Sequence, residues 1–164
     1  KIDLLGSNII NLSGKTSLRQ YMSLIALSDL FIGPNSSGIV ISTALEIPTI
    51  GLFGAFDPGP RTKYYDKFFH ITGKAKCFPC GEHWTECKEG HPAPCMRSIT
   101  PDMVYDQIRT FDAGVGGIDH LLMHGQAGYM DHNDTVASMT LFAREVQPRL
   151  AEMGGEQQYP RTAE

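Results

Sequence analysis

Hydrophobic residues return at helical intervals near the start of the chain. Leu18, Met22 and Ile25 are spaced by four and then three residues, so a helix would place them on one face. Ser13 or Thr16 stands where such a helix needs an N-cap. We therefore expect a helix whose apolar stripe packs against a core.

Two short runs downstream, residues 29–33 and 49–54, are apolar almost without a break. Residues 34–38 interrupt the pattern after the first run, and residues 39–45 resume it as an apolar helix. Strands that are apolar on both faces are typical of parallel sheets covered by helices on each side. The order helix, strand, helix, strand predicts an α/β fold.

The last part of the chain predicts one strand and one helix, a short βα tail. Residues 118–124 form the candidate strand, and residues 131–133 can cap the helix. Pro148 should kink that helix, and Gly154 can end it. Its apolar positions advance by alternating threes and fours: Val136, Met139, Ala143, Val146, Leu150 and Met153.

Composition divides the chain near residue 110. Residues 1–110 hold 11 Lys and Arg against 10 Asp and Glu, whereas residues 111–164 hold 3 against 8, and the whole carries a net charge of −4. That charge argues against a nucleic-acid surface, and no apolar run is long enough to span a membrane. The glycine-rich residues 111–117 are the expected junction. The chain opens on Lys1, so we expect a piece of something longer.

The turn after the first predicted strand is the better candidate for a ligand site. Asn35, Ser36, Ser37 and Gly38 lead into a helix, and helix N-termini at the carboxyl edge of a parallel sheet favour phosphate groups. Asn and Ser are also preferred N-caps without any ligand, and this alternative stays open. The second loop carries Asp57, which with Arg61 and Lys63 could meet a ribose or a diphosphate, unless these charges are simply solvated.

All four cysteines of the chain, Cys77, Cys80, Cys87 and Cys95, lie within nineteen residues. A CxxC pair followed by two more cysteines is typical of a structural zinc site, although the second spacing is unusual. Two disulfides or four reduced thiols are the alternatives, and an iron–sulfur cluster is a minor one. No secretory signal is seen, so a reducing cytoplasm is expected, which disfavours disulfides.

Histidines are weaker candidates. His83 and His91 lie inside the cysteine segment and could replace a thiolate, but solvated loop positions are the more common outcome. Around the last predicted strand, we expect surface or hydrogen-bonded roles for His120, His124 and His132.

Three motifs in order carry a family resemblance: NLSGKTSLRQYMSLIALSDLFIG, then PNSSGIVISTALEIPTIGLFGAFDP, then the four-cysteine segment ending in CMRSITPDMV. Together they resemble the C-terminal half of glycosyltransferase family 9, the bacterial heptosyltransferases of lipopolysaccharide synthesis. The resemblance implies that residues 1–110 are part of a Rossmann-like domain that binds an ADP-heptose-like nucleotide-sugar donor, with residues 35–38 at its diphosphate.

The same resemblance implies that no catalytic residue lies in this chain. The family's catalytic acid belongs to an N-terminal acceptor domain, which would be the partner of this segment. No cofactor is needed for the transfer, and the isolated chain should be inactive. Family members commonly read Asp-(Ser/Thr)-Gly-Pro-x-His at the loop, where Asn35, Ser37, Gly38 and Val40 stand here at the acidic, Gly-Pro and histidine positions. The expected location is the cytoplasm, at the inner face of the bacterial inner membrane.

Residues 112–153 resemble another family, the end of the TIM barrel of bacterial-luciferase-like flavin monooxygenases. We therefore expect a chimera with its junction near residue 110. Two alternatives follow for the function: a fragment of an FMN-dependent monooxygenase, or a non-catalytic module held together by a metal. A last βα unit alone cannot build a flavin site, because the contacts come from several barrel loops.

Overall fold

The computed structural model describes residues 9–81, 87–90, 93–126 and 130–153. Its centre is a sheet of four strands in the order β3-β2-β1-β4, and every neighbouring pair is parallel. The strands are β1 (Leu30–Pro34), β2 (Thr49–Phe53), β3 (Phe68–Thr72) and β4 (Leu121–Met123). The expectation of an α/β fold with a parallel, partly Rossmann-like sheet is confirmed.

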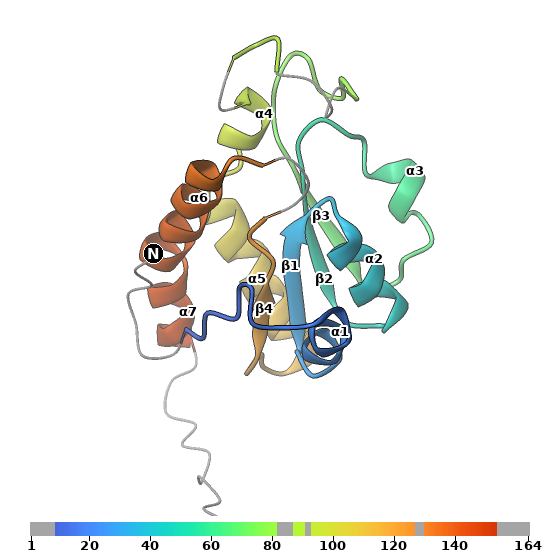
Figure 1. Cartoon of the computed structure of the whole chain (residues 1–164), viewed down its shortest axis with the longest axis vertical. Helices are drawn as coiled ribbons and strands as arrows, with labels where there is room; N and C mark the ends of the chain where they lie inside the picture. Colours follow the sequence, from blue (N-terminus) through green and yellow to red (C-terminus); the bar gives the residue numbers. More distant parts are fainter. Residues whose placement is uncertain (1–8, 82–86, 91–92, 127–129, 154–164) are drawn as a thin grey trace, which may run out of the picture.

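Helices cover both faces of the sheet (Figure 1). One face carries α1 (Leu18–Ala26) and α2 (Ser37–Ala44), and the other carries α5 (Pro101–Val115), α6 (His132–Glu145) and α7 (Gln147–Met153). Two single-turn helices, α3 (Gly59–Thr62) and α4 (Pro94–Arg97), lie in the connections. No helix in the described ranges is long and apolar enough to cross a bilayer.

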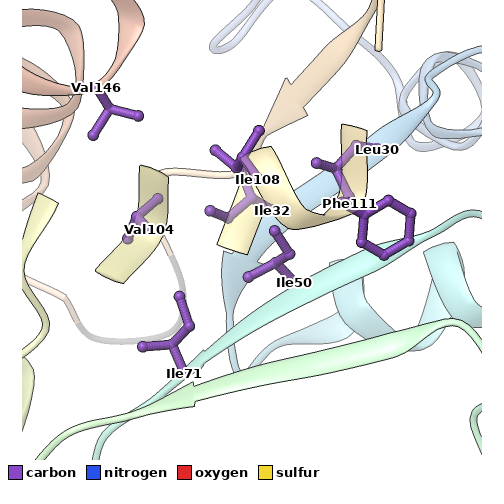
Figure 2. Packing of buried hydrophobic residues seen from close by; sticks show 8 residues of the cluster. All are labelled: Leu30, Ile32, Ile50, Ile71, Val104, Ile108, Phe111 and Val146. Carbon is purple, nitrogen blue, oxygen red and sulfur yellow. The ribbon is translucent and has the colours of Figure 1, made fainter. Parts of the chain in front are cut away.

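Alternation along the strands divides the core into two layers. Leu30 and Ile32 of β1 face α5, whereas Phe31 between them faces α1 and α2. The larger layer is shown in Figure 2 and is made of Leu30, Ile32, Ile50, Ile71, Val104, Ile108, Phe111 and Val146. Burial on both faces explains why β1 and β2 read as continuous apolar runs.

The predicted strand, helix and strand from residue 29 to residue 54 form one parallel βαβ unit. Strand β1 runs parallel to β2, with Ile32 opposite Ile50, and α2 connects them. A buried hydrogen bond of 2.8 Å from Thr49 Oγ1 to Ser42 Oγ ties the start of β2 to α2. The buried hydroxyls of Thr49 and Ser42 therefore have hydrogen-bond partners.

Helix α1 differs from its prediction in two ways. Its N-cap is Ser17, not Ser13 or Thr16, and Ser17 forms a capping box with Gln20. Only Ile25 of the predicted stripe is buried, while Leu18 is 69% and Met22 is 40% exposed. The helix is rotated so that Ile25 and Tyr21, which lies one turn before it, face the sheet.

The C-terminal segment joins the same sheet. Strand β4 pairs in parallel with β1, and the Asp29 carboxylate accepts hydrogen bonds from the backbone N–H of Asp119 (3.0 Å) and His120 (2.8 Å). Val146, at the break between α6 and α7, is buried in the core beside α5. Helix α5 itself runs through residue 110. A division of the chain near residue 110, and a separate origin for its two parts, stay predictions.

Candidate functional site

The turn from β1 into α2 has an unsatisfied hydroxyl. Ser36 is the N-cap of α2, with an extended backbone (φ −148°, ψ −177°), but its side chain makes no capping hydrogen bond. Its Oγ is buried and has no hydrogen-bond partner among the residues that the structure describes. The N-cap interpretation is thus right for the position of Ser36 and does not account for its hydroxyl.

A cavity of about 290 Å³ opens beside this turn. Its walls come from the turn, from α2, from the end of β2 and from the segment around α3: Asn35, Ser36, Ser37, Ile39, Val40, Phe53, Arg61, Thr62 and Tyr65. Since β1 and β2 are parallel, their carboxyl ends meet at this edge of the sheet, which is where α/β folds bind ligands. Three of the predicted site residues, Asn35, Ser36 and Ser37, therefore line one hollow.

Arg61 supplies the positive charge of this cavity. Its guanidinium carbon lies 5.0 Å from the centre of the Phe56 ring, which helps to hold the side chain near the turn. The sequence placed Arg61 in a candidate loop, but Thr62 and Tyr65 gave no recognisable signal. They reach the cavity only because the chain after β2 folds back as α3.

Asp57 is not among the residues that line the cavity. Its Oδ1 accepts a hydrogen bond of 2.9 Å from the backbone N–H of Gly59, and its side chain is exposed. That bond stabilises the turn that starts α3 and so positions Arg61. A donor-binding role for Asp57 stays a prediction.

Gly38 also lies outside the cavity lining, on the side of α2 that faces α1 and β4. A Cβ at this position would stand 2.6 Å from Phe31 Cζ, 2.7 Å from Tyr21 Oη and 2.8 Å from His124 Nδ1. These distances are too short for a methyl group, so neighbouring side chains are one sufficient reason for glycine here. The close approach of a phosphate is not required to explain it.

Tyr21 and His124 form a hydrogen-bonded pair over Gly38. The Tyr21 hydroxyl lies 2.7 Å from His124 Nδ1, and burial raises the pKa of Tyr21 to about 12. Burial also lowers the pKa of His124, against a weaker opposing effect of a backbone hydrogen bond at Gln126. Both groups are therefore neutral at pH 7. His120, by contrast, is exposed and lies near Asp29. The expectation of surface or hydrogen-bonded histidines is therefore confirmed for His120 and His124.

Comparison with known proteins agrees with this architecture. The sequence profile of glycosyltransferase family 9 (heptosyltransferase) matches residues 2–91, which include β1, α2, β2, α3 and β3. The chain belongs to glycosyltransferase family 9. The predicted family is thereby confirmed, and the cavity at the ends of β1 and β2 lies inside the matched region.

One curated relative is a heptosyltransferase by name. The chain is 29% identical over 102 residues to Lipooligosaccharide heptosyltransferase 2 of Campylobacter jejuni subsp. jejuni serotype O:6 (strain 81116 / NCTC 11828). The match covers 60% of this chain and 31% of the relative, so the family 9 chain spans about a third of that protein. No solved structure matches the chain significantly.

The second predicted resemblance gains no support. The family 9 match ends at residue 91, and neither comparison connects residues 112–153 with luciferase-like flavin monooxygenases. In the structure these residues supply β4 to the edge of β1 and helices α6 and α7 to the core. Nothing in the described part of this family 9 chain favours a flavin-dependent function.

The four cysteines are free thiols and lie apart from the cavity. Cys95 is buried, Cys80 is exposed, and Cys77 and Cys87 are in between. Burial raises the pKa of Cys95, against the opposing effect of a backbone hydrogen bond at Met96 and with smaller contributions from the other three cysteines. Across the described residues, no three His, Cys, Asp or Glu side chains are already arranged to hold a metal, so zinc binding stays a prediction. The alternatives His83 and His91 lie outside the described residues.

Proposed function

We propose that this chain is the donor-binding part of a heptosyltransferase-like glycosyltransferase, and that the diphosphate of an ADP-heptose-like donor binds in the cavity at the start of α2. The observation that carries the proposal is the buried Ser36 Oγ, which has no hydrogen-bond partner among the described residues. A buried hydroxyl without a hydrogen bond costs free energy, and an incoming phosphate oxygen would remove that cost.

Charge supports an anionic ligand at the same place. The first N–H groups of α2 and its dipole favour negative charge, and Arg61 adds a guanidinium to the cavity lining. During transfer, the acceptor oxygen bonds to the anomeric carbon while the bond to the donor diphosphate breaks. The leaving diphosphate gains negative charge, which this arrangement would stabilise.

We further propose that the acceptor and the catalytic acid belong to an N-terminal domain that is the partner of this segment. The resemblance to the family and the 31% coverage of the Campylobacter relative support this division of labour. The place of action would then be the cytoplasmic face of the inner membrane. The chain alone should release no ADP from ADP-heptose in a coupled assay, whatever sugar acceptor is supplied.

Calorimetric titration with ADP tests the donor site directly. Ser36→Ala should weaken ADP binding about tenfold or more, because a hydrogen bond to a charged group is worth about 1.5–3 kcal/mol. Arg61→Gln should weaken it by a similar factor and should reduce its dependence on salt. Lys63→Gln is the matched control, since Lys63 lies on the same turn and is outside the cavity lining.

Two results would contradict the proposal. One is ADP affinity that is the same in Ser36→Ala and Arg61→Gln as in the parent chain. The other is a loss in Lys63→Gln as large as that in Arg61→Gln, which would indicate only a general effect of charge. Gly38→Val is unsuitable here, because its side chain would clash with Phe31 and Tyr21 whether or not nucleotide binds.

A further inference from the structure

Two described parts of the four-cysteine segment contact the residues that directly follow β2, and none of the four cysteines lines the donor cavity. The backbone N–H of Gly81 donates to the carbonyl of Ala55 at 2.8 Å. A Cβ on the preceding residue, Gly54, would lie 3.3 Å from Cys95 Sγ. The turn that carries Cys80 and the helix that carries Cys95 thus rest on two adjacent residues.

A second set of contacts joins the exit of β3 to the Cys95 helix. Ser98 Oγ donates to the carbonyl of Cys95 (2.7 Å) and accepts from the backbone N–H of Lys74 (2.6 Å). The carbonyl of Cys95 is also so close to Gly73 that a Cβ there would overlap it. Cys77 follows Lys74 by three residues, so these contacts hold the chain just before the first cysteine against the helix that carries the last one.

Two glycines give the segment tight turns beside its cysteines. Gly81 follows Cys80 directly and has φ +69°, and Gly90 has φ +102° and donates its N–H to the carbonyl of Cys87 (3.0 Å). These backbone conformations favour glycine over other residues. Among the described residues, no atom beyond the chain neighbours lies within 4 Å of the position of a Cβ on either glycine.

We propose that Cys77, Cys80, Cys87 and Cys95 bind one Zn²⁺ beside the end of β2. Four thiolates in tetrahedral array are a common structural zinc site, and binding would release the thiol protons to solvent as the Zn–S bonds form. The turns at Gly81 and Gly90 must shift to bring every sulfur to about 2.3 Å from the ion.

The test is the metal content of the full chain after incubation with zinc and gel filtration, with the thiols kept reduced. We expect about one Zn²⁺ per chain by elemental analysis, Zn–S distances of about 2.3 Å by X-ray absorption, and four thiols protected from a disulfide-exchange reagent. Cobalt substitution should give the visible absorption of a tetrahedral thiolate site. Cys80→Ser should lower the retained metal at least about tenfold.

Cys80 is the right first target because it is exposed, so its replacement should leave the fold intact, which circular dichroism checks. Lys76→Ser is the matched control on the same loop and should retain its zinc. Zinc retained equally by Cys80→Ser, or less than about a tenth of an ion per parent chain, would overturn the proposal. Loss of two mass units per cysteine pair without reductant would show disulfides instead and would also overturn it.

Discussion

The hydroxyl of Tyr21 lies 2.7 Å from Nδ1 of His124, and this contact joins two parts of the chain that are 103 residues apart. The rings meet edge to face, with centroids 5.6 Å apart. Tyr21 comes from α1, inside the family 9 match, whereas His124 directly follows β4, beyond it. The pair closes over Gly38 and so connects the C-terminal segment to the turn that we propose for the donor.

The first prediction concerns Gly38. Gly38→Ala should lower the free energy of unfolding by about 1–3 kcal/mol, because its methyl group would press on Phe31, Tyr21 and His124. Urea unfolding measures the change. Gly114→Ala is the matched control, because no described atom outside its own helix lies within 4 Å of a Cβ at this position in α5; it should raise the stability by about 0.5–1 kcal/mol. Equal effects of the two substitutions would mean that packing does not require glycine at position 38.

The second prediction concerns acid stability. Burial lowers the pKa of His124 below its ordinary value of 6.5, so on acidification the unfolded chain takes up this proton before the folded protein does. The contribution of His124 is therefore complete above about pH 6.5 and is lost as the pH falls below that value. His124→Gln should flatten this part of the profile of unfolding free energy against pH.

The control for this profile is His120→Gln, since His120 is exposed and lies 3.7 Å from Asp29. It should keep the parent's decline below about pH 6.5. If His124→Gln declines as steeply as the parent, another group is responsible for the acid sensitivity.

Much of the fold could be predicted from the sequence, because β1 and β2 are apolar on both faces and the turn between β1 and α2 contains strong helix breakers. The rotation of α1 could not be predicted. Leu18 and Met22 have the spacing of a buried stripe, but Tyr21 takes the inward position because its hydroxyl finds His124. His124 is distant from Tyr21 in the sequence, and no local sequence pattern indicates that the two residues meet.

The residues of the candidate site likewise fall into two groups: those that a local sequence pattern indicates, and those that only tertiary contacts bring to the site. Asn35, Ser36 and Ser37 could be chosen because a strand, a turn and a helix follow one another there. Thr62 and Tyr65 depend on how the chain folds back after β2, and Gly38 has a packing partner in β1 as well as in α1. Residues brought together by tertiary contacts alone are those that sequence reasoning missed or explained differently.

The third prediction tests whether the C-terminal segment stabilises the sheet. Val146 is 1% exposed in the core layer of Figure 2, so Val146→Ala should cost about 2 kcal/mol of unfolding free energy. Leu141→Ala on the same stretch of α6 is the control, because Leu141 is 47% exposed and its loss should cost less than about 0.5 kcal/mol. Thermal unfolding that is unaffected by Val146→Ala would indicate that residues after α5 form no part of the cooperative unit.

The last prediction compares two serines in the absence of any ligand. The Ser28 hydroxyl is buried and donates to the carbonyl of Ile25 at 2.8 Å, so Ser28→Ala should lower the unfolding free energy by about 1 kcal/mol. Ser36 Oγ is buried without a partner in the described part of the chain, so Ser36→Ala should leave the stability unchanged or raise it. Chemical denaturation of both variants measures the difference.

If ADP is then added at saturation, the effect of Ser36→Ala on the unfolding free energy should reverse, so that the variant becomes less stable than the parent. The parent and Ser28→Ala should both gain stability from the nucleotide, and Ser36→Ala should gain less, since ligand binding stabilises a folded protein in proportion to the logarithm of its affinity. A hydroxyl that costs stability in the free protein and contributes it in the complex belongs to a binding site. Equal gains in all three proteins would assign the orphan hydroxyl of Ser36 to local packing and would place the nucleotide elsewhere.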